Sequence, residues 1–285
     1  MKKPIVALIY DFDKTLCTKD MQEYGFIPSI GMNSSEFWKE VRDLTDRENM
    51  DGILAYMFKM VEKAKEKKVS ISYETFKKLG EGIKYFDGVT TWFKRINEYG
   101  KNIGVRIEHY IVSSGIKEII EGTEIAEYFK KIYACEFMYD YNGSIQWPKF
   151  AINYTAKTQF LFRINKGVLT IDTESADKLN RFTPENERRI PFKNMIYIGD
   201  SDTDIPCMSL VNANGGHSIG VYDPVKKDKD KVYKMMRHHR IRYYAPADYT
   251  NGSKLDTLVK QIIRKTAAYE VLESEYIHCK YEAEE

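Results

Sequence analysis

The chain has 285 residues, about twice a common domain length, so we expect two domains or one large domain with an insert. With 44 basic and 42 acidic residues the net charge is +2, which excludes a global field that would recruit nucleic acid or a membrane. The four cysteines, Cys17, Cys135, Cys207 and Cys279, are far apart, which excludes the usual zinc spacings and a disulfide framework and favours a reducing compartment.

The first predicted element is a strand over residues 5–10, an unbroken apolar run followed by Asp11 and Asp13. Such a run is typical of a central strand in a parallel sheet, which is buried on both faces. The two aspartates then follow its carboxyl end, where open α/β sheets bind ligands. Two like charges there favour a cation such as Mg²⁺, although a solvated surface turn is the alternative interpretation.

The N-terminal stretch also indicates the cellular location of the protein. Lys2 and Lys3 precede only a short apolar run, which ends at Asp11 and is too short for the core of a signal peptide. No stretch of the sequence reaches the length of a membrane span. We therefore expect a cytoplasmic protein with no membrane partner.

Residues 18–84 are predicted to be a small helical insert. Asn33 and Ser34 can cap a first helix, a second helix follows Asp51, and a third begins at Ser72. The apolar faces of these helices contain Met and aromatic residues, which we interpret as core rather than as a ligand-binding face, because amphipathic helices bury such stripes.

Regular alternation of helices and strands resumes after residue 86. A helix over 88–99 is expected to stop at Gly100, and a strand over 110–112 is expected to enter a turn at 113–115. A helix with Ile116, Ile119 and Ile120 and a short strand near 132–137 follow.

Turn signals mark the next part of the chain. The Asn142-Gly143 pair lies between aromatic and apolar residues and predicts a β-hairpin over 139–147. Residues 155–166 predict a helix ended by Gly167, and the polar stretch 173–189 predicts a loop or a loosely packed helix.

The C-terminal third continues the alternation. We expect strands over 195–198 and 219–222, with a helix over 205–211 between them. The mixed-charge residues 226–242 are interpreted as a solvated helix face rather than a phosphate contact, and 253–277 as a long amphipathic helix.

Four groups of polar residues are predicted to follow strands or to lie beside strand ends. Singly, each has a structural explanation: Ser113 or Ser114 can cap a helix, Lys157 can be an exposed lysine, and Asp204 can be an N-cap. Together they supply the parts of phosphoryl transfer through an aspartyl intermediate. These parts are a nucleophilic carboxylate, an acid for the leaving oxygen, carboxylates that suit Mg²⁺, and hydroxyl and ammonium groups for the phosphoryl oxygens. The residues are Asp11, Asp13, Thr15, Ser113, Ser114, Lys157, Asp200 and Asp204.

This set resembles the haloacid dehalogenase superfamily of phosphohydrolases. The D-x-D-x-T motif is present at residues 11–15, and Ser113-Ser114-Gly115 follows an apolar strand as in the second motif. Lys157 matches the third motif, with Lys149 and Lys166 as rivals, and G-D-x-x-x-D is present at 199–204. The resemblance covers most of residues 1–225, and the layout is similar to that of phosphoserine phosphatases and their relatives.

The resemblance implies roles for these residues. Asp11 would be the nucleophile and Asp13 the general acid/base, a second aspartate that marks phosphatases. Asp11, the Asp13 carbonyl and Asp200 would bind Mg²⁺, and Asp204 would support the metal site. Thr15, Lys157 and a hydroxyl of 113–114, with Ser113 preferred, would bind phosphate.

The predicted fold class is α/β: a doubly wound, mostly parallel, Rossmann-like sheet with a small α-helical cap. Residues 1–17 and 85–285 would form the core, and 18–84 the cap, which closes over substrate in relatives. We expect a magnesium-dependent phosphatase acting on a small phosphorylated metabolite. A phosphotransferase or mutase using the same intermediate, and an inactive binding protein on this fold, are the alternatives. The sequence predicts neither the substrate nor the oligomeric state.

Overall fold

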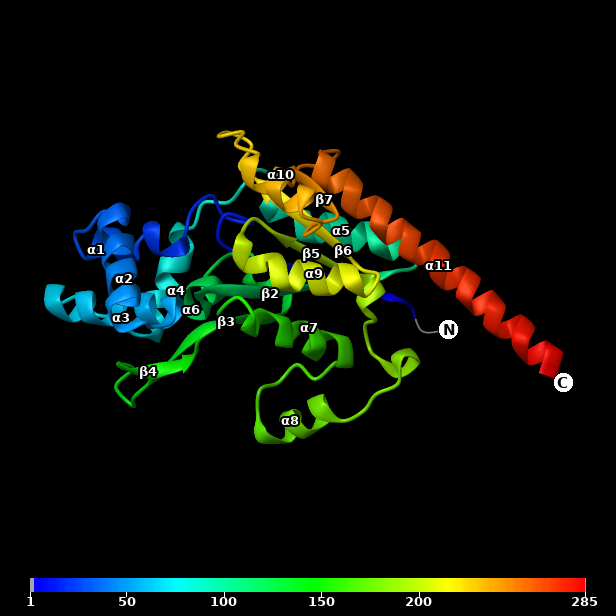
Figure 1. Cartoon of the computed structure of the whole chain (residues 1–285), viewed down its shortest axis with the longest axis horizontal. Helices are drawn as coiled ribbons and strands as arrows, with labels where there is room; N and C mark the ends of the chain where they lie inside the picture. The colour runs from blue at the N-terminus through cyan, green and yellow to red at the C-terminus, as the bar shows by residue number, and fades with distance from the viewer. Residues whose placement is uncertain (1–2, 285) are drawn as a thin grey trace.

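One seven-stranded sheet forms the centre of the molecule (Figure 1). The computed structural model describes residues 3–284, and at position 186 the backbone alone. The strand order is β4-β3-β2-β1-β5-β6-β7, and every neighbouring pair is parallel except the antiparallel β3–β4 pair. The predicted fold class is therefore confirmed. The strands are β1 Ile5–Tyr10, β2 Arg106–Ile116, β3 Phe129–Tyr139, β4 Ile145–Phe150, β5 Met195–Gly199, β6 His217–Tyr222 and β7 Tyr243–Pro246.

Strand β1 is the central strand, as its apolar run predicts. All six of its residues are buried, and it pairs with β2 on one side and β5 on the other. The register places Tyr10 beside Ile111 and Ile198, and the backbone N–H of Asp11 donates to the Ile198 carbonyl at 2.9 Å. This last hydrogen bond fixes where the chain leaves the sheet.

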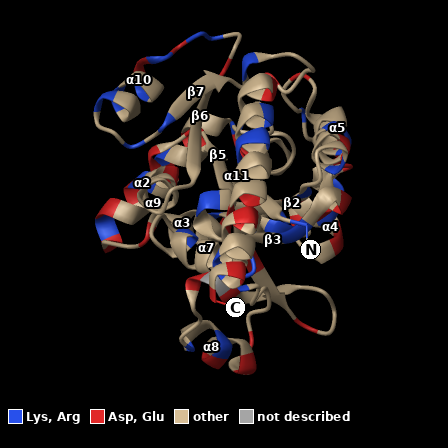
Figure 2. Cartoon of the chain, turned by 90° about the vertical axis from the view of Figure 1, so that its right-hand side faces the viewer, with Lys and Arg blue, Asp and Glu red and all other residues tan. Residues whose placement is uncertain are grey.

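Helices cover both faces of the sheet, as in a doubly wound fold. Figure 2 shows the sheet between α7 and α9 on one side and α5 on the other, with α11 packed beside α5 and β7. The helices from residue 89 onward are α5 Val89–Asn102, α6 Lys117–Glu121, α7 Ala156–Lys166, α8 Thr173–Asn180, α9 Ile205–Ala213, α10 Asp230–Arg237 and α11 Lys254–Glu284. No helix of the described chain combines the length and apolarity that crossing a membrane requires.

The named elements between β1 and α5 are all helices. This segment contains α1 Phe26–Ser29, α2 Ser34–Glu48, α3 Gly52–Lys67 and α4 Tyr73–Leu79. The side chains of Asn33, Asp51 and Ser72 accept hydrogen bonds from the first turns of α2, α3 and α4. The three predicted helix starts are thereby confirmed, whereas the short α1 has no counterpart in the prediction.

Two chain segments connect this helical part to the sheet and lie side by side. Cys17 and Tyr85 form an antiparallel bridge, flanked by hydrogen bonds from Thr18 N to Lys84 O and from Phe86 N to Leu16 O. This two-stranded connection coincides with the predicted boundaries at 17/18 and 84/85. The division into core and cap stays a prediction.

Three elements differ from their prediction. Gly100 lies inside α5 instead of ending it, because a Cβ there would meet Ile107 Cγ1 at 2.5 Å, so glycine permits close packing of α5 on β2. Strand β2 runs through 113–115 to Ile116 rather than turning, with its register to β3 shifted beyond Val112. The four-residue edge strand β7 is absent from the prediction, since so short a run gives no periodic signal.

The predicted hairpin is confirmed. Strands β3 and β4 pair antiparallel across a turn in which Asp140 N donates to Ser144 O and Gly143 has a φ of +78°. The turn contacts the helical segment through a bridge between Ser72 and Ser144. The hairpin therefore extends the sheet toward the predicted cap (Figure 1).

Candidate active site

Three carboxylates meet at the carboxyl ends of β1 and β5. Asp11 follows β1, Asp200 follows β5, and Asp204 ends the 3₁₀ turn Asp202–Asp204 before α9. One oxygen from each lies within 4.8 Å of the other two, a spacing that could hold a metal ion. Neighbouring parallel strands end at the same edge of the sheet, which explains how residues almost 200 positions apart meet.

Lys157 enters this cluster from α7. Its side chain is fully buried, and its Nζ lies 3.2 Å from Asp11 Oδ1 and 2.8 Å from Asp204 Oδ1. Neither rival lysine lies there: Lys166 donates to the main-chain carbonyls of Leu179 and Arg181, and Lys149 forms an ion pair with Glu136. Of the three candidate lysines, the structure brings only Lys157 to the aspartates.

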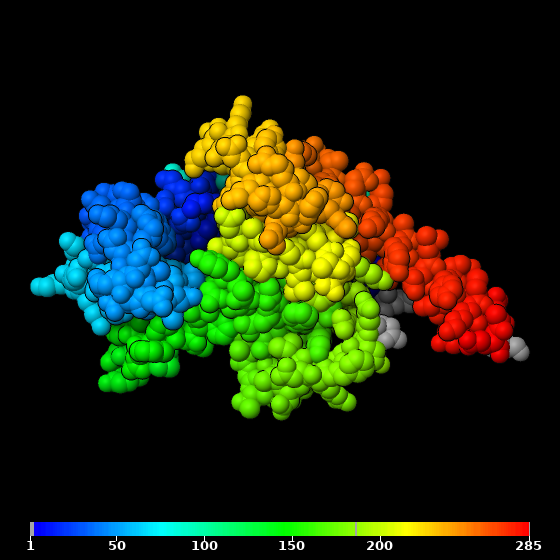
Figure 3. Space-filling model, in the orientation of Figure 1, coloured from blue at the N-terminus to red at the C-terminus, as the bar shows by residue number. Residues whose placement is uncertain are grey.

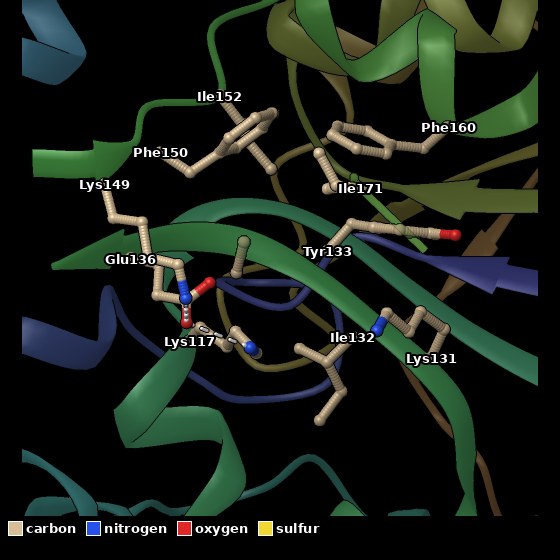
Figure 4. Close-up of a pocket in the computed structure, with 11 residues that line it drawn as sticks. Lys117, Lys131, Ile132, Tyr133, Glu136, Lys149, Phe150, Ile152, Phe160 and Ile171 are labelled. Carbon is tan, nitrogen blue, oxygen red and sulfur yellow. Dashed lines mark hydrogen bonds and ion pairs between the residues drawn. The ribbon is translucent and has the colours of Figure 1, made fainter. Parts of the chain in front are cut away.

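Lys149 instead borders a separate cavity of about 310 Å³ between β3, β4 and α7 (Figure 4). Lys117 and Lys149 both approach Glu136, while Tyr133 and Phe160 stack with ring centroids 4.3 Å apart. None of the predicted site residues lines this cavity. The chemistry expected at the strand ends therefore does not extend into it.

Asp204 is held by protein donors on both of its oxygens. Oδ1 accepts hydrogen bonds from Lys157 and from the Tyr197 hydroxyl at 2.8 Å each. Oδ2 accepts from the backbone N–H and the hydroxyl of Ser201 at 3.2 and 3.1 Å. An oxygen so engaged is better suited to orienting Lys157 than to binding a cation strongly.

Asp11 is engaged on one oxygen only. Its Oδ1 receives the backbone N–H of Phe12 at 2.8 Å and lies against Lys157, while the described hydrogen bonds leave Oδ2 free. Burial and the nearby Asp204 raise the pKa of Asp11 to about 6, despite the opposing effect of Lys157. Burial together with Asp204 and Asp11 raises the pKa of Asp200 to about 7. The excess of negative charge is therefore costly without a cation.

The Asp13 carboxylate interacts with the backbone of Met21. Its Oδ1 accepts the backbone N–H of Met21 at 2.8 Å, just beyond the connection to the helical segment. Burial, Asp20 and Asp11 raise the pKa of Asp13 well above its usual range. This carboxyl group lies outside the three-carboxylate cluster and favours its protonated form, which suits a proton donor.

The hydroxyl oxygens of the three side chains predicted to bind phosphate are buried. Thr15 is fully buried, and within the described residues its Oγ1 has no hydrogen-bond partner. Ser113 Oγ accepts the N–H of Gly115 at 3.0 Å, whereas Ser114 Oγ is another buried hydroxyl without a partner in the described chain. Unsatisfied buried hydroxyls favour a polar ligand or water beside them.

Sequence reasoning missed three residues of this region. Tyr197 supports Asp204 from within β5, and Lys231 of α10 lies 3.9 Å from Asp200 Oδ2. Tyr56 of α3 donates its hydroxyl to the Ser114 carbonyl at 2.6 Å, which connects the helical segment to β2. Only Tyr197 had a signal in the sequence, as a tyrosine two residues before Gly199; the other two contacts depend on tertiary packing.

The fold and the acidic site define an α/β protein with a carboxylate-rich centre at a sheet edge. The family model of haloacid dehalogenase-like hydrolases matches residues 8–209, which include all four predicted motifs. The chain therefore belongs to the haloacid dehalogenase-like hydrolase family. An uncharacterized protein of Borreliella burgdorferi is 31% identical over 278 residues, covering 89% of this chain and 95% of the relative.

Solved structures share this fold at low identity. A HAD-family hydrolase of Salmonella enterica serovar Typhi has a TM-score of 0.56 at 16% identity, covering 91% of this chain and 72% of that one. A phosphoserine phosphatase with an analogue of the phospho-aspartyl intermediate has a TM-score of 0.53 at 15% identity, covering 91% and 99%. A probable phosphoserine phosphatase of Vibrio cholerae has a TM-score of 0.54 at 13% identity, covering 95% and 67%. The fold is thus that of phosphoserine phosphatases.

Proposed function

We propose that this protein is a magnesium-dependent phosphatase that hydrolyses a small phosphorylated metabolite through an aspartyl phosphate on Asp11. The observation that carries the proposal is the contact of the buried Lys157 with Asp11 inside the three-carboxylate cluster. Family membership supports hydrolysis, and the shared fold of phosphoserine phosphatases supports a phosphomonoester as substrate. A reducing, cytoplasmic location stays part of the proposal; the four cysteines are free.

The donor set fits Mg²⁺. Three carboxylates lie within 4.8 Å of one another, and burial raises the pKa of Asp11 and Asp200, a cost that a divalent cation would offset. Asp11 and Asp200 would hold the ion with the Asp13 carbonyl, and Asp204 would support them through its bonds to Lys157 and Ser201. When bound, the ion would lower the repulsion between Asp11 and the anionic phosphate.

Asp11 would attack phosphorus. Because Phe12 N–H and Lys157 both engage Oδ1, the carboxylate orientation is fixed before substrate arrives. The Lys157 ammonium would then also stabilise the charge on the transferring phosphoryl oxygens, together with the Thr15 hydroxyl and a hydroxyl of 113–114. The phosphorus–oxygen bond to the leaving group breaks as the bond to Asp11 forms.

Asp13 would move the protons. The raised pKa of its carboxyl group keeps a proton available for the leaving oxygen. The resulting carboxylate would then take a proton from the water that hydrolyses the aspartyl phosphate. Its hydrogen bond from Met21 N holds it on the side of the predicted cap, residues 18–84, which would shield the site from bulk water and from large substrates.

The test is hydrolysis of p-nitrophenyl phosphate with Mg²⁺ and with excess chelator, followed by a screen of phosphorylated metabolites. Asp11→Asn should lose at least about a thousandfold in kcat. The matched control is Asp202→Asn, since Asp202 belongs to the same acidic stretch but is exposed and outside the cluster. Equal turnover by wild type and Asp11→Asn would contradict the proposal. Transfer of phosphate to an added alcohol in preference to water would favour a phosphotransferase.

A further inference from the structure

The C-terminal helix α11, Lys254–Glu284, divides into two parts. Its first half packs on the core: Leu255, Val259 and Ile263 are fully buried. Its second half extends past the body of the protein, as the red segment shows in Figures 1 and 3. The ion pairs that the described structure gives for residues 271–284 join positions within this same helix, His278 with Glu282 and Lys280 with Glu284.

The projecting part is too apolar for a helix that ends in solvent. Leu272 is 70% exposed and Tyr276 is 64% exposed, whereas Tyr269, one turn earlier, is partly exposed and has Lys193 Nζ 4.1 Å from its ring centroid. An isolated helix of this length is only marginally stable in water. Exposed apolar side chains in a row indicate an interaction surface.

These residues follow a heptad pattern. Starting from Tyr269, the spacings are three, four, three and four, and the row is Tyr269, Leu272, Tyr276, Cys279 and Ala283. Such spacing places all five side chains along one seam, at positions a and d of a coiled coil. At 3.6 residues per turn, Tyr269 points only about 20° away from the core-facing Ile262, and the row then turns progressively away from the core-facing side toward the C-terminal end of the helix.

We propose that this seam pairs with the same seam of a second copy of the chain, in a parallel two-stranded coiled coil. A seam of identical residues is self-complementary about a two-fold axis. In the parallel arrangement, Glu275 at position g faces Lys280 at position e of the second copy, an attraction made twice. In the antiparallel arrangement, Glu275 faces Glu282 of the second copy at the g positions and repels it, which offsets the attraction between Glu273 and Lys280 at the e positions. Charge therefore selects the parallel pair.

The test compares neighbouring residues of equal exposure. Leu272 is 70% exposed on the seam, and Val271 is 69% exposed off it. In sedimentation equilibrium, the wild type should dimerise in a concentration-dependent way, Leu272→Glu should weaken the dimer by about tenfold or more, and Val271→Glu should change it little. Tyr276→Ala and Tyr281→Ala form a second matched pair, since Tyr281 is 68% exposed off the seam. Circular dichroism verifies that each variant folds.

Charge reversal tests the orientation. Glu275→Lys and Lys280→Glu should each weaken the dimer, and the double variant should restore it. A tighter dimer in Glu275→Lys would overturn the parallel arrangement. A monomeric wild type at high protein concentration, or equal effects of Leu272→Glu and Val271→Glu, would overturn the seam.

Discussion

Two charge clusters, each with buried carboxylates, lie on neighbouring strands of the sheet, and their charges are balanced in opposite ways. At the carboxyl ends of β1 and β5, three carboxylates lie together, and the buried ammonium of Lys157 contacts two of them, Asp11 and Asp204. In β2, the single carboxylate of Glu108 is bound by Arg189 through both oxygens, at 2.6 and 2.7 Å, and by Arg106 at 2.9 Å. Tyr110 adds a hydrogen bond of 2.6 Å.

The pKa values of the two clusters move in opposite directions. Burial raises the pKa of Asp11 and Asp200, and the neighbouring carboxylates add to it. Burial also acts to raise the pKa of Glu108, but Arg189, Tyr110 and Arg106 outweigh it and lower that pKa. A cluster with more carboxylates than cations favours the binding of a further cation, whereas a carboxylate that is paired with arginines needs no additional partner. The difference separates a candidate active site from a structural ion-pair cluster.

The largest expected effect comes from removing Lys157, the buried cation of the acidic cluster. Lys157→Met leaves Asp11 and Asp204 without their shared partner, so unfolding free energy should fall by about 3 kcal/mol or more. Turnover of p-nitrophenyl phosphate should drop by at least about a hundredfold. Urea denaturation and initial rates measure the two effects.

The control for Lys157→Met is Lys166→Met on the same helix, since Lys166 binds only main-chain carbonyls outside the site. That variant should keep its turnover. If Lys157→Met hydrolysed the ester as fast as wild type, the acidic cluster would lose its catalytic interpretation.

The balanced cluster should respond in stability alone. Glu108→Gln replaces a carboxylate bound by two arginines, and should lower the unfolding free energy by about 1.5–3 kcal/mol at pH 7 with little change in turnover. Because the folded-state pKa of Glu108 is lowered, its contribution is full above the unfolded-state pKa of about 4.3 and is lost as pH falls through the folded value.

Urea denaturation at several pH values measures that loss. The difference in unfolding free energy between wild type and Glu108→Gln should become smaller below about pH 4.3. A difference in unfolding free energy that stayed constant down to pH 3, or a large loss of turnover by Glu108→Gln at pH 7, would mean that the two clusters do not have distinct roles.

The sequence predicted the acidic cluster and missed the balanced one for a physical reason. Asp11 and Asp200 follow short apolar runs, and such runs identify strands whose ends share one sheet edge. Glu108 and Arg189 are 81 positions apart, and nothing local marks either of them as a partner of the other. Helix starts were likewise predictable, because Asn33, Asp51 and Ser72 act on their own first turns.

Features that depend on packing were not predictable. Gly100 looked like a helix end, yet its role is to let α5 approach Ile107. The continuation of β2 through 113–115 depends on its pairing with β3, which a local Ser-Ser-Gly turn signal cannot reveal. Tyr56 and Lys231 reach the site from α3 and α10, elements whose placement follows from the fold.

The smallest expected effect on stability is a gain, at Asp200. Asp200→Asn removes one of three crowded negative charges, and Lys231, its ion-pair partner at 3.9 Å, is 45% exposed and gives little in return. Without metal, the free energy of unfolding of this variant should therefore be about 1 kcal/mol higher than that of wild type. This change is opposite in sign to that of Glu108→Gln.

With Mg²⁺ bound, wild type should become more stable than Asp200→Asn. A ligand that binds only the folded state stabilises it by RT ln(1 + [L]/Kd), so millimolar Mg²⁺ should raise the melting temperature of wild type and leave that of Asp200→Asn nearly unchanged. Asp202→Asn, whose side chain is exposed and outside the cluster, should respond to Mg²⁺ as wild type does. An Asp200→Asn protein that is less stable than wild type without metal, yet gains as much from Mg²⁺, would show that Asp200 balances charge as Glu108 does and binds no ion.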